Sequence, residues 1–310
     1  MTKDEATALS FQEKTALLRE DPVTCDRYFD HRFRALFNKV LKSAAGSLGE
    51  IVDFFYRVEF QHRGSPHVHG LLWIKDAPVY DSEDPESAPP VVEFIDRYIT
   101  CHKPQEDQPM HEEVKLQQHK HSHTCLKQKG KEKTCRFGIP HYPMPETMIL
   151  EPIKDQDLSD NPNAAKRMRD QLKKQAKAIF ERLKTLRPED DIQIADLLRE
   201  QDMAMEQYIM ALRTTIKRSK VFLKRDISER RTNAYNADIL TLWRANMDLQ
   251  YIVDPYACVM YIINYVGKAQ RGMSTLLRNA LTEVRKGNAS IKEQLRKIRN
   301  VFVKSSELSA

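Results

Sequence analysis

The sequence predicts an α+β fold in which a β-hairpin is combined with several helices. The stretch from Val58 to Ile74 has the pattern of two strands around a turn. Charged segments after residue 160 have apolar residues at helical spacing. A third observation is the pair Asp254-Pro255, which is typical of a helix start.

The first predicted helix spans residues 22–45. Apolar side chains recur at helical spacing within it, among them Tyr28, Phe33 and Phe37. We find no convincing β-strand pattern before Pro22.

The predicted hairpin, VEFQHRGSPHVHGLLWI, is unusually rich in metal-binding side chains. Its strands are 58–61 and 66–74, and the turn is RGS. Residues two apart in a strand share a face, so His67 and His69 point the same way. Glu59 and Gln61 share a face on the first strand, and the spacing does not decide which of them lies beside the histidines. Two imidazoles and one oxygen ligand suit a divalent metal that keeps positions open for substrate.

Two other interpretations of the hairpin stay open at this point. Histidines two apart on a strand can be ordinary hydrogen-bonded residues. Metal-dependent oxygenases also use two histidines and a carboxylate, so the pattern alone does not define a function.

The middle of the chain contains a Cys/His segment followed by a helical insertion. In HKHSHTCLKQKGKEKTCRFGIP, the side chains of His119, His121, His123, Cys125 and Cys135 offer more ligands than one tetrahedral zinc needs. The alternative is a basic surface loop with incidental histidines. After it, residues 163–186 and most of 192–216 are predicted to be charged helices, and residues 288–303 an amphipathic helix.

The helix predicted to begin at Asp254-Pro255 carries chemistry on one stripe. Tyr261 and Tyr265 are four residues apart, and Lys268 follows three later, so all three share a helix face. A tyrosine hydroxyl near a metal and a cation is a candidate covalent nucleophile for a phosphodiester. The alternative is an aromatic stripe that faces the core.

Together, the His-x-His strand and the YxxxYxxK helix resemble the HUH endonucleases of rolling-circle replication initiators. The words VEFQHRGSPHVHG, HKHSHTC…CRFGIP and RANMDLQYIVDPYACVMYIINYVGK are similar to the Rep region of Helitron transposons. The resemblance covers roughly residues 22–274. It implies an antiparallel sheet of HUH/ferredoxin-like type with packed helices, a Cys/His zinc-like insertion, and a helical insertion before the tyrosine helix.

The resemblance also implies the roles of individual residues. His67 and His69, with Glu59 or Gln61, would bind Mg²⁺ or Mn²⁺. Tyr261 and Tyr265 would attack single-stranded or locally melted DNA and form a 5′-phosphotyrosine, assisted by Lys268. In the family pattern the zinc ligands are His119, His121, Cys125 and Cys135. The enzyme would nick and join DNA, act in the nucleus, and use a helicase partner in trans.

Composition is consistent with this interpretation. The 310 residues include 50 Lys and Arg against 44 Asp and Glu, which gives a formal net charge of +6, and the local basic clusters are more informative than this total. Five cysteines, two of them in the zinc-like segment, fit a reducing intracellular compartment. No apolar run approaches the ~20 residues of a membrane span, and the N-terminus lacks the apolar core of a secretory signal.

We expect four segments along the chain. Residues 1–100 hold the N-terminal helices and the metal-binding hairpin, 101–145 the Cys/His segment, 146–250 the charged helical insertion, and 251–310 the tyrosine helix and C-terminal amphipathic helix. The sequence contains no GxxxxGK[ST] motif, so we expect a truncated Helitron gene without its helicase. The alternative function is a catalytically inactive, zinc-stabilised DNA-binding remnant, and the oligomeric state stays unknown.

Overall fold

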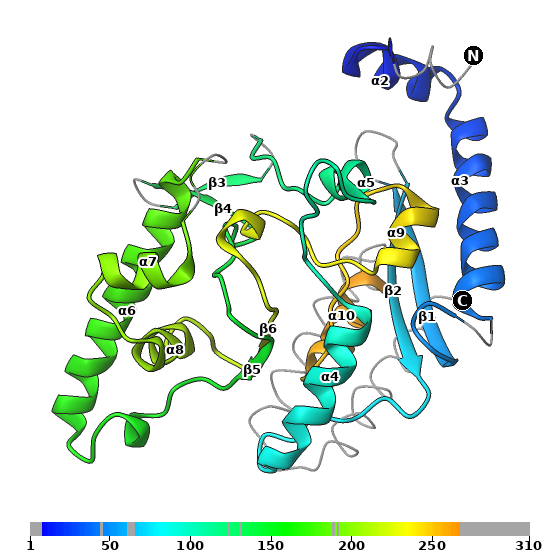
Figure 1. Cartoon of the computed structure of the whole chain (residues 1–310). Helices are drawn as coiled ribbons and strands as arrows, with labels where there is room; N and C mark the ends of the chain where they lie inside the picture. The colour runs from blue at the N-terminus through cyan, green and yellow to red at the C-terminus, as the bar shows by residue number, and fades with distance from the viewer. Residues whose placement is uncertain are drawn as a thin grey trace, which may run out of the picture. The chain divides into compact units, whose positions relative to one another are not determined.

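The computed structural model describes residues 8–43, 46–60, 66–122, 125–129, 132–187, 190 and 192–266 (Figure 1). The chain divides into two compact units, each built from segments that are distant in sequence. We call the first the hairpin unit, which consists of Met1–Asp26, Phe54–Leu72 and Asp254–Ala310. We call the second the helical unit, which consists of Arg27–Asp53 and Trp73–Val253.

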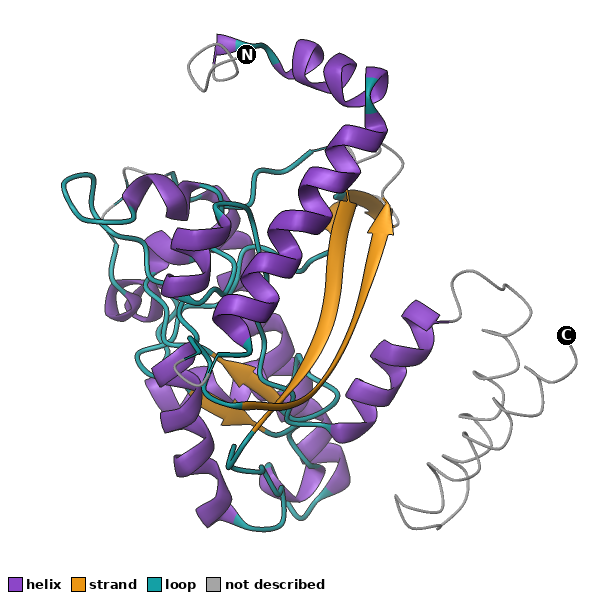
Figure 2. Ribbon diagram, turned by 90° about the vertical axis from the view of Figure 1, so that its right-hand side faces the viewer, coloured by secondary structure: helices purple, strands orange, loops and turns teal. Residues whose placement is uncertain are grey.

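The hairpin unit contains most of a long two-stranded sheet. Its strands are β1 (Ile51–Phe60) and β2 (Pro66–Ile74), drawn in orange in Figure 2. Five residues connect them, which is too short for a parallel crossover, so the pair is antiparallel. A Cβ at Gly70 would lie 3.4 Å from the carbonyl oxygen of Phe55, which is ordinary van der Waals contact with the neighbouring strand.

Helices of the hairpin unit begin at clear capping residues. In α2 (Phe11–Glu20), the backbone N–H of Glu13 donates to Ser10 Oγ, and the backbone N–H of Ser10 donates to the Glu13 carboxylate. The next helix, α3 (Pro22–Leu36), starts in this unit and continues into the helical unit. The last described helix is α10 (Pro255–Val266).

The helical unit contains the remaining described elements. In chain order they are the π-helix η1 (Phe37–Leu41), η2 (Pro85–Ser87), α4 (Ala88–Tyr98), α5 (His111–Lys115), β3 (Leu126–Lys129), β4 (Glu132–Cys135), β5 (Met148–Leu150), η3 (Asp155–Asp157), α6 (Pro162–Thr185), α7 (Ile194–Glu200), α8 (Met205–Arg213), β6 (Lys220–Phe222), η4 (Ile227–Glu229) and α9 (Ala237–Trp243). Strands β3 and β4 form an antiparallel pair, and so do β5 and β6.

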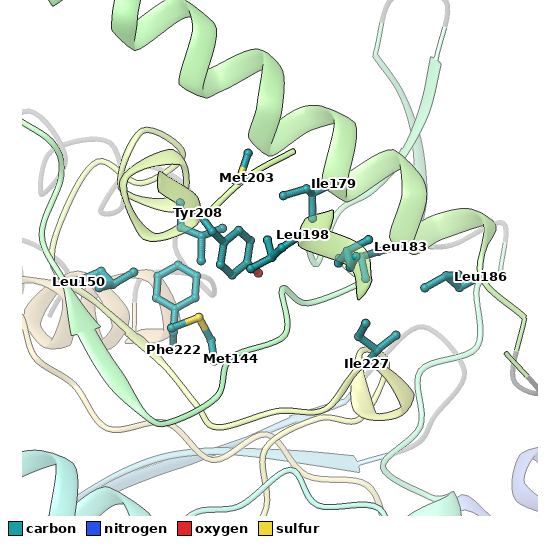
Figure 3. Close-up of a cluster of buried hydrophobic side chains, with 12 residues drawn as sticks. Met144, Leu150, Ile179, Leu183, Leu186, Leu198, Met203, Tyr208, Phe222 and Ile227 are labelled. Carbon is teal, nitrogen blue, oxygen red and sulfur yellow. The ribbon is translucent and has the colours of Figure 1, made fainter. Parts of the chain in front are cut away.

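The main hydrophobic core of the helical unit lies where α6, α7 and α8 pack near the β5–β6 pair (Figure 3). The buried side chains of α6 include Leu172, Ala176, Ile179 and Leu183, which recur every three or four residues. Tyr208 is fully buried in the core, and its hydroxyl donates to the Pro143 carbonyl at 2.8 Å. The buried hydroxyl of Tyr208 therefore has a hydrogen-bond acceptor, which the backbone supplies.

Arg230 closes the C-terminal end of α6. Its buried guanidinium donates to the carbonyl oxygens of Leu183 at 3.1 Å and Leu186 at 2.6 Å. The last carbonyls of a helix have no partner within the helix, so this arginine supplies the missing donors. Burial lowers the pKa of Arg230, because the charged form loses contact with water.

Several predicted elements are confirmed. The charged helix predicted at 163–186 is α6, and the tyrosine helix begins at Pro255 as predicted. The stretch 192–216 is helical in two parts, α7 and α8. It is interrupted at Asp202, whose φ of +46° cannot continue a right-handed helix.

Two boundaries differ from the prediction. The first strand begins at Ile51, seven residues before Val58, because IVDFFYR is itself rich in β-branched and aromatic residues. The helix predicted to reach Ala45 ends at Leu36 and continues only as a π-helix to Leu41.

The coarse fold class is confirmed: the described part of the chain combines helices with small antiparallel sheets. Those sheets are each two-stranded, and the larger HUH-type sheet and the four-segment division stay predictions. The helix predicted at 288–303 lies outside the described residues. None of the described helices is both long and apolar enough to cross a membrane.

Candidate functional site

The two histidines of β2 stand side by side. His67 and His69 are two residues apart in the strand, and their ring centroids are 4.8 Å apart. Both side chains are half-buried. The strand period therefore places two imidazoles on one face of the hairpin, as the sequence predicts.

Glu59 on β1 contacts this pair directly. Its Oε2 lies 3.1 Å from His69 Nε2, and the side chains of His69 and Glu59 are 17% and 32% exposed. A carboxylate on the neighbouring strand thus meets the imidazole face. Gln61, the other candidate oxygen ligand, lies outside the described residues.

Helix α10 brings a tyrosine to the same face, although 192 residues separate Tyr261 from His69. Asp254 precedes the helix and caps it, because its carboxylate accepts from the Tyr256 N–H at 2.9 Å. Pro255 occupies the first helical position, where a missing N–H has no cost. Two turns later, the Tyr261 hydroxyl lies 3.0 Å from His69 Nδ1.

His69 therefore has a partner at each ring nitrogen. An ionised carboxylate can only accept, so the Glu59 contact assigns the ring proton to Nε2. When the ring is neutral, Nδ1 carries the lone pair and accepts from the Tyr261 hydroxyl. The three side chains form a carboxylate–imidazole–phenol chain within the hairpin unit.

Helix α10 carries more than the predicted tyrosine stripe. Ile263 is buried against Tyr256, Val259 and Met260, so α10 also has an apolar face. The side chain of Tyr265 and all of Lys268 lie outside the described residues.

The donor types around His69 suit a divalent metal, although the hydrogen bonds occupy the same atoms. Two imidazoles and one carboxylate match the ligands that Mn²⁺ accepts in proteins. A metal bound by His69 would use a ring nitrogen that now contacts Glu59 or Tyr261. Binding would therefore open one of these two hydrogen bonds.

A second constellation, the Cys/His cluster, lies in the helical unit. It comprises His119, His121, Cys125 and Cys135, and one ligand atom from each lies within 4.8 Å of every other. The histidines precede β3, and Cys135 ends β4, so the β3–β4 ribbon returns the chain to its start. His123 lies outside the described residues.

Three of the donor–donor distances in the Cys/His cluster match the edges of a tetrahedral zinc site, while the ligand atoms as a set lie within 4.8 Å of one another. Zn–N bonds of about 2.05 Å and Zn–S bonds of about 2.3 Å imply edges of about 3.3 Å for N···N and about 3.6 Å for N···S. His119 Nε2 lies 3.2 Å from His121 Nδ1. Cys125 Sγ is 3.6 Å from His121 Nδ1, and Cys135 Sγ is 3.7 Å from His119 Nε2. The cluster could therefore bind a metal, and its dimensions are compatible with structural zinc.

Electrostatics also favour metal binding by the cluster. Burial lowers the pKa of His119, and the charges of His121 and Arg231 lower it further. Burial and Arg231 also lower the pKa of His121. Both pKa shifts favour the neutral imidazole, which is the form that binds a metal. The backbone N–H of Ser122 donates to Cys125 Sγ at 3.2 Å, which stabilises a thiolate.

Comparison with known proteins gives one match. Residues 2–72 match the family model described as "Helitron helicase-like domain at N-terminus". The N-terminal segment is Helitron-like. No curated protein and no solved structure matches the chain.

The Helitron match contains Glu59, His67 and His69 but ends before Tyr261 and the Cys/His cluster. The match therefore concerns the N-terminal segment alone, residues 2–72 of the 310. The structure alone connects this segment to the tyrosine helix.

The resemblance implied that the tyrosine helix acts beside the histidine pair, and the structure brings Tyr261 to His69. Spacing alone could not give this contact, since the residues are far apart in the chain. Sequence reasoning missed Arg231, which lies beside the Cys/His cluster. Its backbone carbonyl accepts from the backbone N–H of His119, and a contact between such distant segments leaves no local pattern in the sequence.

Proposed function

We propose that the chain is a rolling-circle-type endonuclease and strand transferase that acts on single-stranded DNA. The observation that carries the proposal is the 3.0 Å contact between the Tyr261 hydroxyl and His69, whose other nitrogen faces Glu59. The Helitron-like N-terminal segment supplies the histidines and the carboxylate. This combination supports nucleophilic attack on a phosphodiester better than it supports an oxygenase.

The proposed nucleophile is Tyr261. Its oxygen forms a bond to phosphorus, the bond from phosphorus to the 3′ oxygen breaks, and its electron pair stays on that oxygen. The phenol loses one proton and the leaving oxygen gains one, so the products are a 5′-phosphotyrosine and a free 3′-hydroxyl. An unperturbed tyrosine has a pKa of about 10, so removal of the proton needs help. His69 Nδ1 accepts a hydrogen bond from this hydroxyl and therefore faces the departing proton.

Glu59 has a positioning role in this scheme. Its contact with Nε2 fixes the ring orientation and the tautomer that leaves Nδ1 free to accept. A divalent cation held by His67, His69 and Glu59 would supply Lewis-acid polarisation of the phosphate. Such a cation would replace one of the two hydrogen bonds of His69, so metal binding and proton acceptance at Nδ1 are alternative roles of this side chain. Tyr265 is the proposed second nucleophile, and Lys268 is proposed to offset the developing negative charge.

The proposed covalent link explains joining as well as cleavage. A phosphotyrosine conserves the phosphodiester bond, so a 3′-hydroxyl can displace the tyrosine without ATP. Two tyrosines would allow one strand to be held while another is cut. The proposal places the protein in the nucleus, with strand separation carried out by a helicase in trans.

We further propose that the Cys/His cluster is a structural zinc site. All four ligands come from the protein, which is typical of structural rather than catalytic zinc. Its edges of 3.2, 3.6 and 3.7 Å support this assignment. Zinc would then hold the β3–β4 ribbon, while the chemical step belongs to the hairpin unit.

The test is formation of a covalent protein–DNA adduct on a denaturing gel, with labelled single-stranded DNA and Mn²⁺ or Mg²⁺. Tyr261→Phe and Tyr265→Phe each remove one hydroxyl and keep the ring. Either single variant should retain some cleavage, because the other tyrosine can still attack, but it should lose strand transfer, which needs both tyrosines. The double variant should form no adduct and still bind DNA through Lys and Arg contacts. The His67→Ala, His69→Ala double variant should also form none.

Tyr256→Phe is the matched control, because it removes a hydroxyl from the same helix on its apolar side. This variant should form adduct like the wild type. An adduct that persists in the double tyrosine variant would refute the assignment of the nucleophiles. Wild-type protein that binds DNA but forms no adduct would favour the inactive DNA-binding remnant.

A further inference from the structure

An exposed aromatic ring stands directly beside the Cys/His cluster. Phe137 is 52% exposed and follows Cys135 by two residues. Its ring centroid lies 5.6 Å from that of His119, in an edge-to-face arrangement. The guanidinium carbon of Arg136 lies 4.5 Å from the Phe137 centroid. A large apolar side chain is thus presented to solvent with a cation against it.

The backbone holds Phe137 in this position. The N–H of Arg136 donates to the Cys125 carbonyl at 2.8 Å, which ties the turn to the other ligand strand. The N–H of Gly138 donates to the Cys135 carbonyl at 3.1 Å, and Gly138 has a φ of +70°, which favours glycine. Phe137 is therefore fixed by the same turn that ends the cluster, with His119 against its edge.

The ribbon that precedes this ring is strongly basic. Between Leu126 and Arg136 the sequence has five Lys or Arg residues and one Glu, a formal charge of +4. Lys127, Lys133 and Arg136 are exposed, and Lys120 is exposed beside His119. A polyanion is therefore the partner that this surface complements in charge.

We propose that Phe137 is a stacking platform for an unpaired base of single-stranded nucleic acid, with Arg136 and the ribbon lysines contacting the adjacent phosphates. An exposed ring with neighbouring cations is the combination that single-strand binding surfaces use, since every base offers a π-face and every link a phosphate. A base inside a duplex is already stacked on its neighbours, so the ring should favour single strands. An acidic peptide would use the charges and leave the aromatic face without a role.

This inference rests on the proposed function in one respect, because it assigns a second contact to the same single-stranded DNA. It differs in location and chemistry. The ring belongs to the helical unit, and no covalent step is involved. Binding can therefore be measured without Mg²⁺ or Mn²⁺, so that cleavage does not enter the result.

The experiment measures binding of the zinc-loaded full chain to a fluorescein-labelled single-stranded oligonucleotide by fluorescence anisotropy. Loss of one base–aromatic stack should weaken binding roughly 5- to 150-fold. We expect this loss for Phe137→Ala and for Phe137→Leu, which keeps apolar bulk without a ring, whereas Phe137→Trp should bind like the wild type. Affinity for a duplex of the same sequence should change less than twofold.

Tyr28→Ala is the matched control. Tyr28 is 62% exposed, and the guanidinium carbon of Arg32 lies 5.7 Å from its ring centroid. Tyr28 and Arg32 thus form a similar aromatic–arginine pair, far in sequence from the Cys/His cluster. This variant should bind the oligonucleotide like the wild type.

Salt dependence separates stacking from charge. The dependence of log Kd on log salt should keep its slope in Phe137→Ala, because the ring releases no counterions. The slope should fall in the Lys127→Gln, Lys133→Gln double variant. Zinc content, measured for every variant, should stay at the wild-type value.

Several results would overturn the inference. Phe137→Leu that binds as tightly as the wild type would exclude base stacking, as would equal effects of Phe137→Ala on single strands and duplex. Displacement of the oligonucleotide by an acidic peptide whose own binding needs Phe137 would reassign the surface. If Phe137→Ala binds the oligonucleotide like the wild type and the chain still forms the covalent adduct, this inference is refuted and the nuclease proposal is not. If binding needs Phe137 but the wild type forms no adduct, the nuclease proposal is refuted and this inference is not.

Discussion

Removal of metal from the Cys/His cluster should expose two of the five cysteines and leave a third unreactive. All five are free thiols in the structure. Cys125 is buried, Cys135 is half-buried, and both are proposed zinc ligands. A thiolate bound to zinc has little free electron density for an alkylating reagent. We therefore expect Cys125 and Cys135 to resist iodoacetamide in the zinc-loaded protein and to react after treatment with a chelator.

Cys101 provides an internal control whose behaviour follows from burial alone. Its side chain is 1% exposed, and burial raises its pKa to about 11. At pH 8, a thiol with that pKa is roughly 0.1% ionised, against roughly a quarter for an ordinary cysteine of pKa ~8.5. Ionisation alone therefore slows alkylation of Cys101 roughly 200-fold, with or without zinc. Its reactivity should rise only as the pH approaches 11.

The assay is peptide mass mapping after timed alkylation at pH 8, with and without chelator, and zinc determination by elemental analysis. Cys25 is half-buried and lies outside the cluster, so it reports the uninhibited rate in both samples. Equal labelling of Cys125 and Cys135 in the two samples, together with no zinc in freshly purified protein, would refute the structural zinc site. Fast labelling of Cys101 only after chelation would show that the metal supports more of the helical unit than the cluster itself.

Two further predictions concern stability. Tyr208→Phe should lower the free energy of unfolding by about 1–3 kcal/mol, because the buried Pro143 carbonyl loses its donor; urea unfolding would show a lower midpoint at an unchanged slope, and an unchanged midpoint would contradict the prediction. Burial, with Arg225 next, lowers the pKa of His141 to about 3. Its stabilising contribution is therefore complete above the unfolded pKa of ~6.5 and is lost as the pH falls toward 3, by up to about 1.4 kcal/mol per pH unit. In a plot of the free energy of unfolding against pH, His141→Gln should flatten the decline at acid pH. His31→Gln, at an exposed histidine, should leave the decline unchanged. Identical curves for the wild type and both variants would exclude His141 as the cause.

Local sequence patterns predicted the elements of the site better than their assembly. The strand period placed His67 and His69 on one face, and the Asp254-Pro255 pair located the start of α10. Both follow from interactions within a few residues. The strand start at Ile51 was not predicted, although residues 51–57 are rich in β-branched and aromatic side chains. The choice of Glu59 as the contact of His69 depended on strand pairing, which spacing alone does not fix.

The Cys/His cluster shows the same limit. The four side chains that the resemblance to Helitron Rep regions singled out lie together in the structure, where they could bind a metal. They span only 17 residues, and the short ribbon between the cysteines brings its two ends together. The surroundings were not predictable in this way. Arg231 comes from a segment about 100 residues later, and the turn at Gly138 that presents Phe137 depends on backbone bonds across the ribbon.

The neighbouring residues Arg230 and Arg231 connect two parts of the helical unit. The carbonyl of Arg231 accepts from the backbone N–H of His119, a cluster residue, while the side chain of Arg230 binds the carbonyls at the end of α6. Metal affinity and the fraying of α6 should therefore be thermodynamically linked, with equal coupling free energy in both directions. A substitution that loosens the end of α6 would weaken metal binding without touching a ligand. Selection on the metal site would then also constrain a helix end that never contacts the ion.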